Sequence, residues 1–224
     1  MRQLGRHMED LTAGDVPNIA DKIYVHPLHV AASTGQVDAS LCSRLVLNEK
    51  ANQMEAPRGA GFSTCGFNCN ELDGYGKSAL HWASSAGLED WVSTLLHSGA
   101  DPNIDDGRAQ TALHEAVAGS YDSTVRLLLK AGADLNHQEC MRGRSPLHMA
   151  AMFGTPGIVK MLCDAGARHD LRDRWEGFTP LMSAVAKNKL RATKVLLEHG
   201  ADPETEVRNL RSALRGVCID SLQR

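Results

Sequence analysis

A leucine recurs along most of the chain at a nearly constant interval, and this regularity limits the folds that the chain can adopt. The leucines stand in similar segments, such as SALH, TALH and SPLH, at Leu28, Leu80, Leu113, Leu147, Leu181 and Leu214. Successive leucines are separated by 52, 33, 34, 34 and 33 residues, and the first interval equals one repeat of 33 plus 19 inserted residues. A Gly-Ala pair, usually followed by Asp, recurs in the same phase at Gly99, Gly132, Gly166 and Gly200. Two markers in phase indicate an array of structural repeats.

Ser145 to Gly166 shows what one repeat contains. The segment reads as two short helices folded back on each other, with Gly154 at the break, because glycine turns without steric cost. The apolar faces of the two helices consist of Leu147, Ala150 and Ala151, and of Ile158, Val159, Met161 and Leu162. Such short helices are unstable alone, since about 12 to 15 residues are already marginal in water. The repeats must therefore stack on one another, which predicts an all-α solenoid.

The repeat resembles the ankyrin repeat in two segments of its sequence. These segments stand in this chain as TALHEAV with LLLKAGADLN, and as SPLHMAA with MLCDAGARHD. The resemblance covers about Pro17 to Leu214. It implies a β-turn finger and two antiparallel helices in each repeat, stacked into a curved solenoid. We therefore expect about five full ankyrin repeats, with degenerate half-repeats at the two ends.

The register of the repeats predicts three regions. Residues 1–25 form either a degenerate half-repeat with a cap helix or a disordered leader, and residues 26–211 form the array. Residues 48–69 hold the insertion, which we expect to be a loop because it contains one proline and three glycines. Residues 212–224 begin a sixth unit, which is either a shortened cap or the point where a longer protein was cut.

Composition excludes several classes of function. The chain has 24 basic and 27 acidic residues and a net charge of −3, which argues against bulk electrostatic binding to nucleic acid. No apolar run approaches the ~18 residues of a membrane span, and the charged N-terminus does not resemble a secretory signal. The six cysteines show no disulfide framework, which favours reduced thiols and a cytoplasmic or nuclear location.

The candidate metal and catalytic residues favour structural roles. His29, His81, His114 and His148 recur once per repeat, so they are spread along the stack, and the resemblance implies that each fixes a turn by hydrogen bonding. Cys65 and Cys69 lack the two further ligands of a closed zinc site, so we expect ordinary loop thiols. The motifs of hydrolases, nucleotide-binding loops and dinucleotide-binding folds are missing from the sequence. We therefore expect no enzyme activity, metal, cofactor or small-molecule substrate.

The resemblance implies that the finger tips and the exposed face of the first helices line a concave groove. We expect a partner to bind there, mainly at repeats three to five, which begin near Thr111, Ser145 and Thr179. The candidate partner-binding residues are Tyr75, Arg108, Met141, Arg142, Arg144, Met152, Phe153, Arg174, Trp175 and Phe178. Large apolar residues at positions that packing does not require suggest a contact surface, and Trp and Arg are enriched at binding hot spots. We expect the partner segment to carry apolar and acidic side chains, although Glu139, Asp173 and Glu176 partly neutralise the arginines. In the alternative, Trp175 folds over its own finger and Phe153 fills a gap between repeats. Trp82 and Trp91 are expected in the core.

The resulting functional prediction is a monomeric module or adaptor that binds another protein. The segments MEDL and LDGYGKSALH resemble the ankyrin-repeat-and-SOCS-box family, which implies a substrate receptor of a cullin-type ubiquitin ligase, but no SOCS box is recognisable. An ankyrin inhibitor that masks a transcription factor is the other alternative. Asn103 and Asn136 resemble ankyrin asparagines that an asparaginyl hydroxylase modifies, or else they shape the finger turns by hydrogen bonds.

Overall fold

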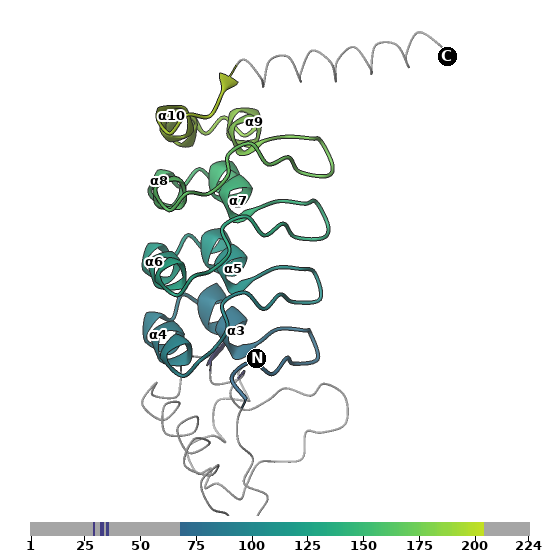
Figure 1. Cartoon of the computed structure of the whole chain (residues 1–224), viewed down its shortest axis with the longest axis vertical. Helices are drawn as coiled ribbons and strands as arrows, with labels where there is room; N and C mark the ends of the chain where they lie inside the picture. Colours follow the sequence, from purple (N-terminus) through teal and green to yellow (C-terminus); the bar gives the residue numbers. More distant parts are fainter. Residues whose placement is uncertain (1–28, 30–31, 34, 36–67, 204–224) are drawn as a thin grey trace, which may run out of the picture.

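Helices in antiparallel pairs make up most of the described chain. The structure is a computed structural model, and it describes residues 29, 32, 33, 35 and 68–203. The helices in chain order are α3 (Ala79–Ser85), α4 (Glu89–His97), α5 (Ala112–Ala118), α6 (Asp122–Lys130), α7 (Pro146–Phe153), α8 (Pro156–Asp164), α9 (Pro180–Ala186) and α10 (Leu190–Glu198). Figure 1 shows the pairs stacked one on another, with a finger loop before each first helix projecting to the same side. An all-helical repeat solenoid is therefore confirmed for the described residues, where the only β-pairing is a single bridge between Asp105 and Thr111.

The first helices of the four described pairs, α3, α5, α7 and α9, each begin at a hydroxyl residue with an extended backbone. The four N-cap residues are Ser78, Thr111, Ser145 and Thr179. In α7, the Ser145 hydroxyl accepts a hydrogen bond from the backbone N–H of His148, and the His148 ring accepts one from the backbone N–H of Ser145. This reciprocal capping satisfies amide groups that would otherwise lack partners at the helix start. The leucine that marks the repeat lies two residues after each cap, so the sequence period is also the period of helix starts.

A left-handed backbone position separates the two helices of each repeat. Gly87 and Gly154 have φ angles of 68° and 77° at this position, as expected for the break at Gly154. Ser120 and Asn188 occupy the equivalent positions in the other two repeats, with φ angles of 59° and 54°. A serine, unlike glycine, has a side chain that makes a positive φ unfavourable, so the repeat of α5 and α6 carries backbone strain at Ser120.

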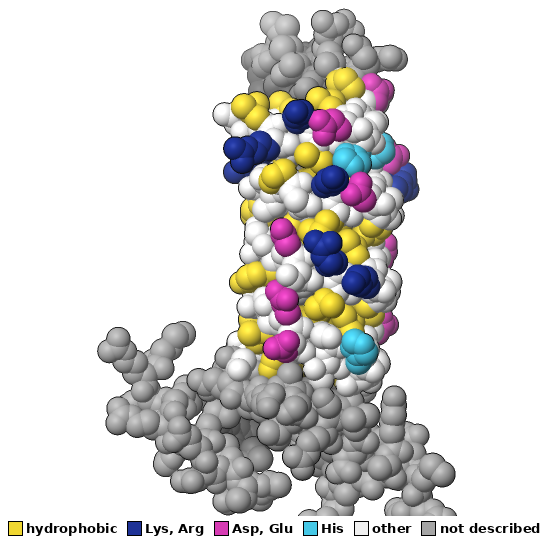
Figure 2. Space-filling view, turned by 90° about the vertical axis from the view of Figure 1, so that its left-hand side faces the viewer, with side chains coloured by type: hydrophobic (Ala, Val, Ile, Leu, Met, Phe, Trp, Pro, Cys, Tyr) yellow, Lys and Arg dark blue, Asp and Glu magenta, His cyan; other side chains and the backbone are white. Residues whose placement is uncertain are grey.

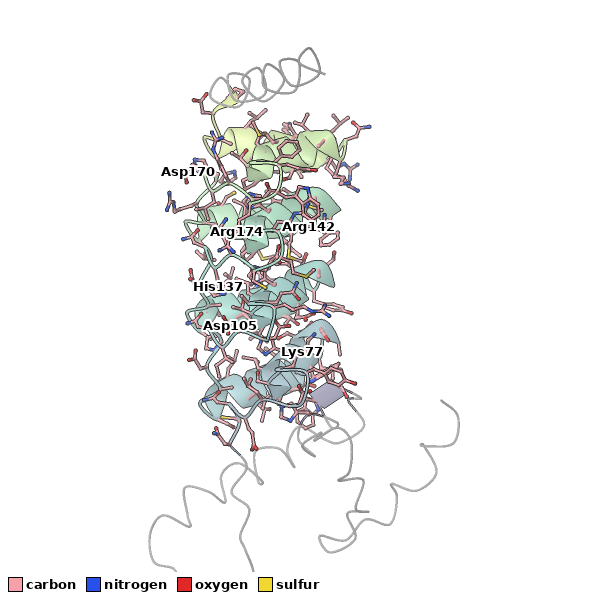
Figure 3. The ribbon with its side chains drawn as sticks, turned by 90° about the vertical axis from the view of Figure 1, so that its right-hand side faces the viewer. Lys77, Asp105, His137, Arg142, Asp170 and Arg174 are labelled. Atoms are coloured by element: carbon pink, nitrogen blue, oxygen red, sulfur yellow. The ribbon has the colours of Figure 1, made fainter. Side chains whose placement is uncertain are left out.

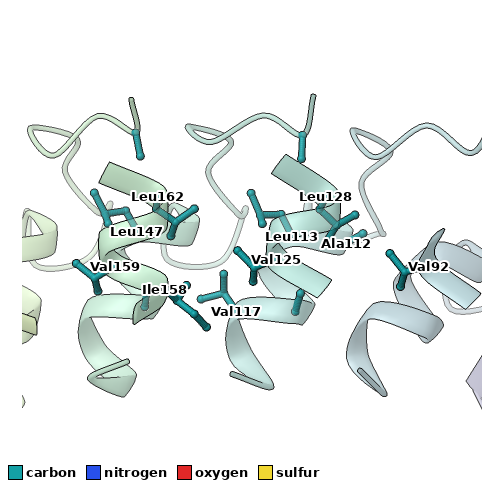
Figure 4. Close-up of a cluster of buried hydrophobic side chains, with 14 of the residues drawn as sticks. Val92, Ala112, Leu113, Val117, Val125, Leu128, Leu147, Ile158, Val159 and Leu162 are labelled. Carbon is teal, nitrogen blue, oxygen red and sulfur yellow. The ribbon is translucent and has the colours of Figure 1, made fainter. Parts of the chain in front are cut away.

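A continuous aliphatic core runs through the stack (Figure 4). Leu113, Leu128, Leu147 and Leu162 are fully buried, and alanines from the first helices fill the narrow spaces between repeats. The prediction that Trp91 lies in the core is confirmed. The same prediction for Trp82 is wrong in part. Its ring is only partly buried and packs against the core, and its indole N–H donates a hydrogen bond to the carboxylate of Asp73 in the finger.

The C-terminal face of the described array is open. Val185 in α9 is 59 % exposed, whereas Val117 and Ala151 at the equivalent positions of α5 and α7 are completely buried by the following repeat. Residues 212–224, where we expect a sixth unit, lie outside the described residues, as do residues 1–25 and most of the predicted insertion. None of the described helices has the length and apolar character needed to cross a bilayer.

Candidate partner-binding surface

A buried carboxylate organises each described finger. Asp106 accepts hydrogen bonds from the backbone N–H groups of Arg108 and Gln110, at 2.8 and 2.9 Å. Glu139 binds the backbone N–H groups of Met141, Arg142 and Arg144 in the next finger. Asp73 and Asp173 do the same in the first and last of these fingers. All four side chains are buried. These carboxylates fix the tips, because each one satisfies several backbone donors at once.

This role was missed in the sequence analysis. Glu139 and Asp173 were expected to stand beside the arginines as neutralising surface charges, but both point inward and bind the backbone of their own fingers. The signal was present in the sequence, since an acidic residue stands seven or eight positions before the repeat leucine in every described finger. Of the three carboxylates expected to neutralise the arginines, Glu176 alone is exposed, so the exposed side of these fingers is more basic than the residue count suggests.

Backbone hydrogen bonds join neighbouring fingers. The N–H of Arg174 donates to the carbonyl of Arg142 at 2.7 Å, and the N–H of Cys140 donates to the carbonyl of Arg108 at 3.0 Å. Figure 3 shows the fingers arranged one above another, with labelled side chains from successive fingers along the same side. The fingers therefore form a connected row rather than independent loops.

The repeat histidines extend these connections into the core. Nε2 of His81, His114 and His148 lies 2.9, 3.2 and 2.9 Å from a backbone carbonyl of the following finger. Because Nδ1 of each ring accepts the N–H of the helix cap, the ring proton is on Nε2 and is donated to that carbonyl. Burial lowers the pKa of all three rings, and it lowers that of His114 to about 4.

These histidines hold the repeats together as neutral side chains, which agrees with the structural role expected for them. His29 also makes a bond of this kind, with Nε2 3.0 Å from the carbonyl of Glu71. Among the described residues, no three or more His, Cys, Asp or Glu side chains are grouped in a way that would hold a metal ion.

The two candidate asparagines also connect repeats. The side-chain oxygen of Asn103 accepts the N–H of Asp134 at 2.7 Å, and its amide group donates to the carbonyl of Gly132 at 3.3 Å. The side-chain oxygen of Asn136 accepts the N–H of Arg168 at 2.9 Å. These contacts agree with the prediction that the asparagines shape the turns by hydrogen bonding. Hydroxylation of either residue stays a prediction.

Five of the candidate residues are exposed on the last two described fingers and the end of α7. Trp175 is 73 % exposed, Met141 67 % and Phe153 45 %, and the Arg142 and Arg174 side chains are also exposed. The guanidinium carbon of Arg142 lies 5.1 Å from the centre of the Trp175 ring. We call these five residues the Arg142–Trp175 patch. The Trp175 ring has the Arg142 guanidinium of the preceding finger over its face and stays exposed, so it does not fold over its own finger alone.

The other candidates are placed differently. The Arg144 side chain is largely covered, with Nε 3.8 Å from a carboxylate oxygen of Asp173, so it supports the fingers from within. Met152 and Phe178 are half-buried, and the backbone carbonyl of Phe178 is the acceptor for His148. Tyr75 and Arg108 are exposed, but they lie on earlier fingers.

The opposite face of the described array exposes Leu190 and Leu197 of α10, but no pair of a cation and an aromatic ring is found there. Figure 2 shows the outer helices, where acidic and basic side chains are interspersed and apolar side chains are scattered between them. Charges of both signs on a solvated surface favour solubility rather than one kind of partner. The Arg142–Trp175 patch is therefore the stronger candidate for a binding site.

Comparison with known families agrees with the geometry. The family model described as ankyrin repeats (3 copies) matches residues 7–106, 63–139 and 113–207, and these matches together extend over most of the chain. A comparison with curated proteins found no match.

Proposed function

The chain belongs to the ankyrin-repeat family, and on this premise we propose that it is a non-catalytic module that binds a partner protein through the Arg142–Trp175 patch. Ankyrin repeats generally mediate protein–protein interaction. The observation that carries the proposal is the exposure of Met141 and Trp175 on the two fingers that carry Arg142 and Arg174, together with the exposure of Phe153 at the end of α7.

Two physical arguments support this location. Exposed apolar side chains that gather with polar neighbours are typical of interaction sites, and Trp and Arg supply much of the binding energy at interfaces. The fingers that carry the patch are held by buried carboxylates and by the Arg174–Arg142 backbone bond. A surface that is already ordered loses little conformational entropy on binding.

Affinity capture with a triple variant tests the proposal. We expect Met141→Ser, Phe153→Ser and Trp175→Ser together to abolish capture of the partner from cell lysate, with little change in the melting temperature. The matched control is Leu72→Ser with Leu190→Ser, which removes two exposed leucines outside the patch. A partner that is captured equally by the triple variant would reject the patch as the binding site.

The identity of the captured partner separates the two narrower functions. Elongin and cullin components would indicate a substrate receptor of a ubiquitin ligase, as the resemblance of MEDL and LDGYGKSALH suggests. A DNA-binding factor would indicate an inhibitor of transcription. We propose a cytoplasmic or nuclear monomer in either case, and sedimentation and cell fractionation test this.

A further inference from the structure

The described residues contain two pairs of a cation and a tryptophan. The pairs occupy different positions of the repeat, since Trp82 lies in α3 and Trp175 in a finger, and they also differ in whether the chain supplies an anion. Lys77 lies over Trp82 with its nitrogen 5.1 Å from the ring centre, the same distance as in the pair of Arg142 and Trp175. In the first pair the chain itself supplies an anion, because the Lys77 nitrogen lies 2.5 Å from a carboxylate oxygen of Glu115. The Trp82 indole N–H also has a carboxylate acceptor, Asp73, at 2.7 Å.

The second pair has no such anion within the described residues. The ion pairs formed by the described residues include neither Arg142 nor Arg174. Glu139 and Asp173 of these fingers are buried and bind the backbone, whereas Glu176 is exposed but takes part in none of these ion pairs.

The Arg142 side chain is exposed and takes part in no ion pair among the described residues, so its N–H groups are available to a partner. A guanidinium that stacks on an aromatic ring uses its flat face, and its N–H edge can still bind a carboxylate through two parallel hydrogen bonds. Arg174 adds a second positive charge close by, since its backbone N–H bonds the carbonyl of Arg142 and its guanidinium lies 3.5 Å from the carbonyl of Cys140. Met141 and Trp175 expose apolar surface next to these charges.

We propose that the patch binds an acidic segment of the partner protein. An Asp or Glu side chain of that segment pairs with the guanidinium edge of Arg142, in the place that Glu115 takes beside Lys77, and an adjacent apolar side chain packs on Trp175. The inference rests on the proposed function and names the chemistry of its partner. A peptide is favoured over a nucleic acid, because the chain has a net charge of −3 and the patch exposes apolar side chains beside its arginines.

Selection from a library of random 12-residue peptides displayed on phage tests this chemistry. The full chain should enrich peptides in which Asp or Glu neighbours an aromatic or aliphatic residue. Arg142→Gln should weaken binding of the best synthetic peptide at least tenfold, and replacing the critical peptide Glu by Gln should do the same. The two changes combined should be no worse than either alone, as expected for groups that contact each other.

Control variants separate this contact from general effects of charge. Lys77→Gln removes the other stacked cation and should change the affinity less than twofold. Arg142→Lys keeps the charge but loses the planar edge, so it should restore only part of the affinity. The proposal is overturned if the selected peptides lack acidic residues or if no peptide is enriched. It is also overturned if the best peptide binds Arg142→Gln as tightly as the wild type, or if a labelled oligouridine binds tightly in a way that depends on Arg142.

Parallel capture from lysate distinguishes failure of the acidic-segment proposal from failure of the proposed function. If the triple variant loses a protein partner but no acidic peptide is enriched, the proposed function stands and the acidic segment is rejected. If the triple variant retains its partner, the proposed function at this patch fails as well.

Discussion

Acidification should unfold the array partly through His114. Its ring is buried between two repeats, where Nδ1 accepts the N–H of Thr111 and Nε2 donates to the carbonyl of Arg144, and burial lowers its pKa from the ordinary 6.5 to about 4. Between these two values the unfolded chain binds a proton that the folded chain does not. Stability is therefore retained above pH 6.5 and is lost as the pH falls toward 4.

The size of the effect follows from the two pKa values. At pH 5 the ring is almost fully protonated in the unfolded chain and about one tenth protonated in the folded chain, which corresponds to a loss of about 2 kcal/mol relative to neutral pH. His81 and His148 have lowered pKa values for the same reason and add to the slope in the same direction.

The variant His114→Gln isolates this contribution. Glutamine at the third helical position still accepts a hydrogen bond from the cap, but it does not titrate. At pH 7 the variant should be less stable than the wild type by about 1 kcal/mol, because a hydrogen bond to the next finger is lost.

Urea denaturation followed by circular dichroism at pH 7.5 and pH 5.0 measures the free energy of unfolding for both proteins. We expect the wild type to lose about 2 kcal/mol more than the variant between these pH values, so the variant should be the more stable protein at pH 5.0 by about 1 kcal/mol. Equal losses in the two proteins would refute the argument that burial sets the protonation of His114.

Four further predictions concern stability and reactivity. Ala109 has a φ of 54° at a finger position where the other described fingers have glycine, so Ala109→Gly should raise the free energy of unfolding by about 1 kcal/mol in urea titrations; a lower value contradicts the strain. Asn103→Ala removes two hydrogen bonds to the next repeat and should cost about 1 to 2 kcal/mol in the same assay, whereas an unchanged midpoint would mean that solvent replaces both. Burial raises the pKa of the Cys163 thiol to about 11, so iodoacetamide at pH 8 should modify exposed Cys140 much faster, and mass spectrometry showing equal rates would reject this. If residues 212–224 begin a sixth repeat on the open face of α9, Leu214→Ala should destabilise the protein by about 2 kcal/mol or more; wild-type stability would argue against that repeat.

The fold was predictable because its determinants are periodic in the sequence. A leucine every 33 or 34 residues, a hydroxyl residue two positions earlier and a histidine one position later specify where each first helix begins. Short helices cannot fold separately, so the period alone requires stacking.

The surface was less predictable, because spacing does not indicate which way a charged side chain turns. Glu139 and Arg142 are close in sequence and both charged, yet one is buried against backbone N–H groups and the other is stacked on a tryptophan of the next finger. Arg144 was predicted to face the partner together with Arg142, but it lies largely covered beside Asp173. Trp82 was predicted in the core because its position faces the partner helix. Its indole N–H instead bonds Asp73, and the ring is only partly buried.

The bonds that cross from one repeat to the next also have a mechanical consequence. Each histidine joins its helix to the following finger, but the residue at this position in the last described repeat is Met182, which cannot form the same bond. The boundary that follows α10 therefore lacks this bond, whereas α9 and α10 are still joined to the preceding repeat through His148 and Phe178. A protein pulled from its C-terminus should yield first at that boundary and then give way one repeat at a time. The pair of Arg142 and Trp175 straddles the boundary between the last two described fingers, so detachment of α9 and α10 would pull it apart. A bound partner would thus fasten these two repeats together, and the force needed to peel the array from this end would report directly on occupancy of the patch.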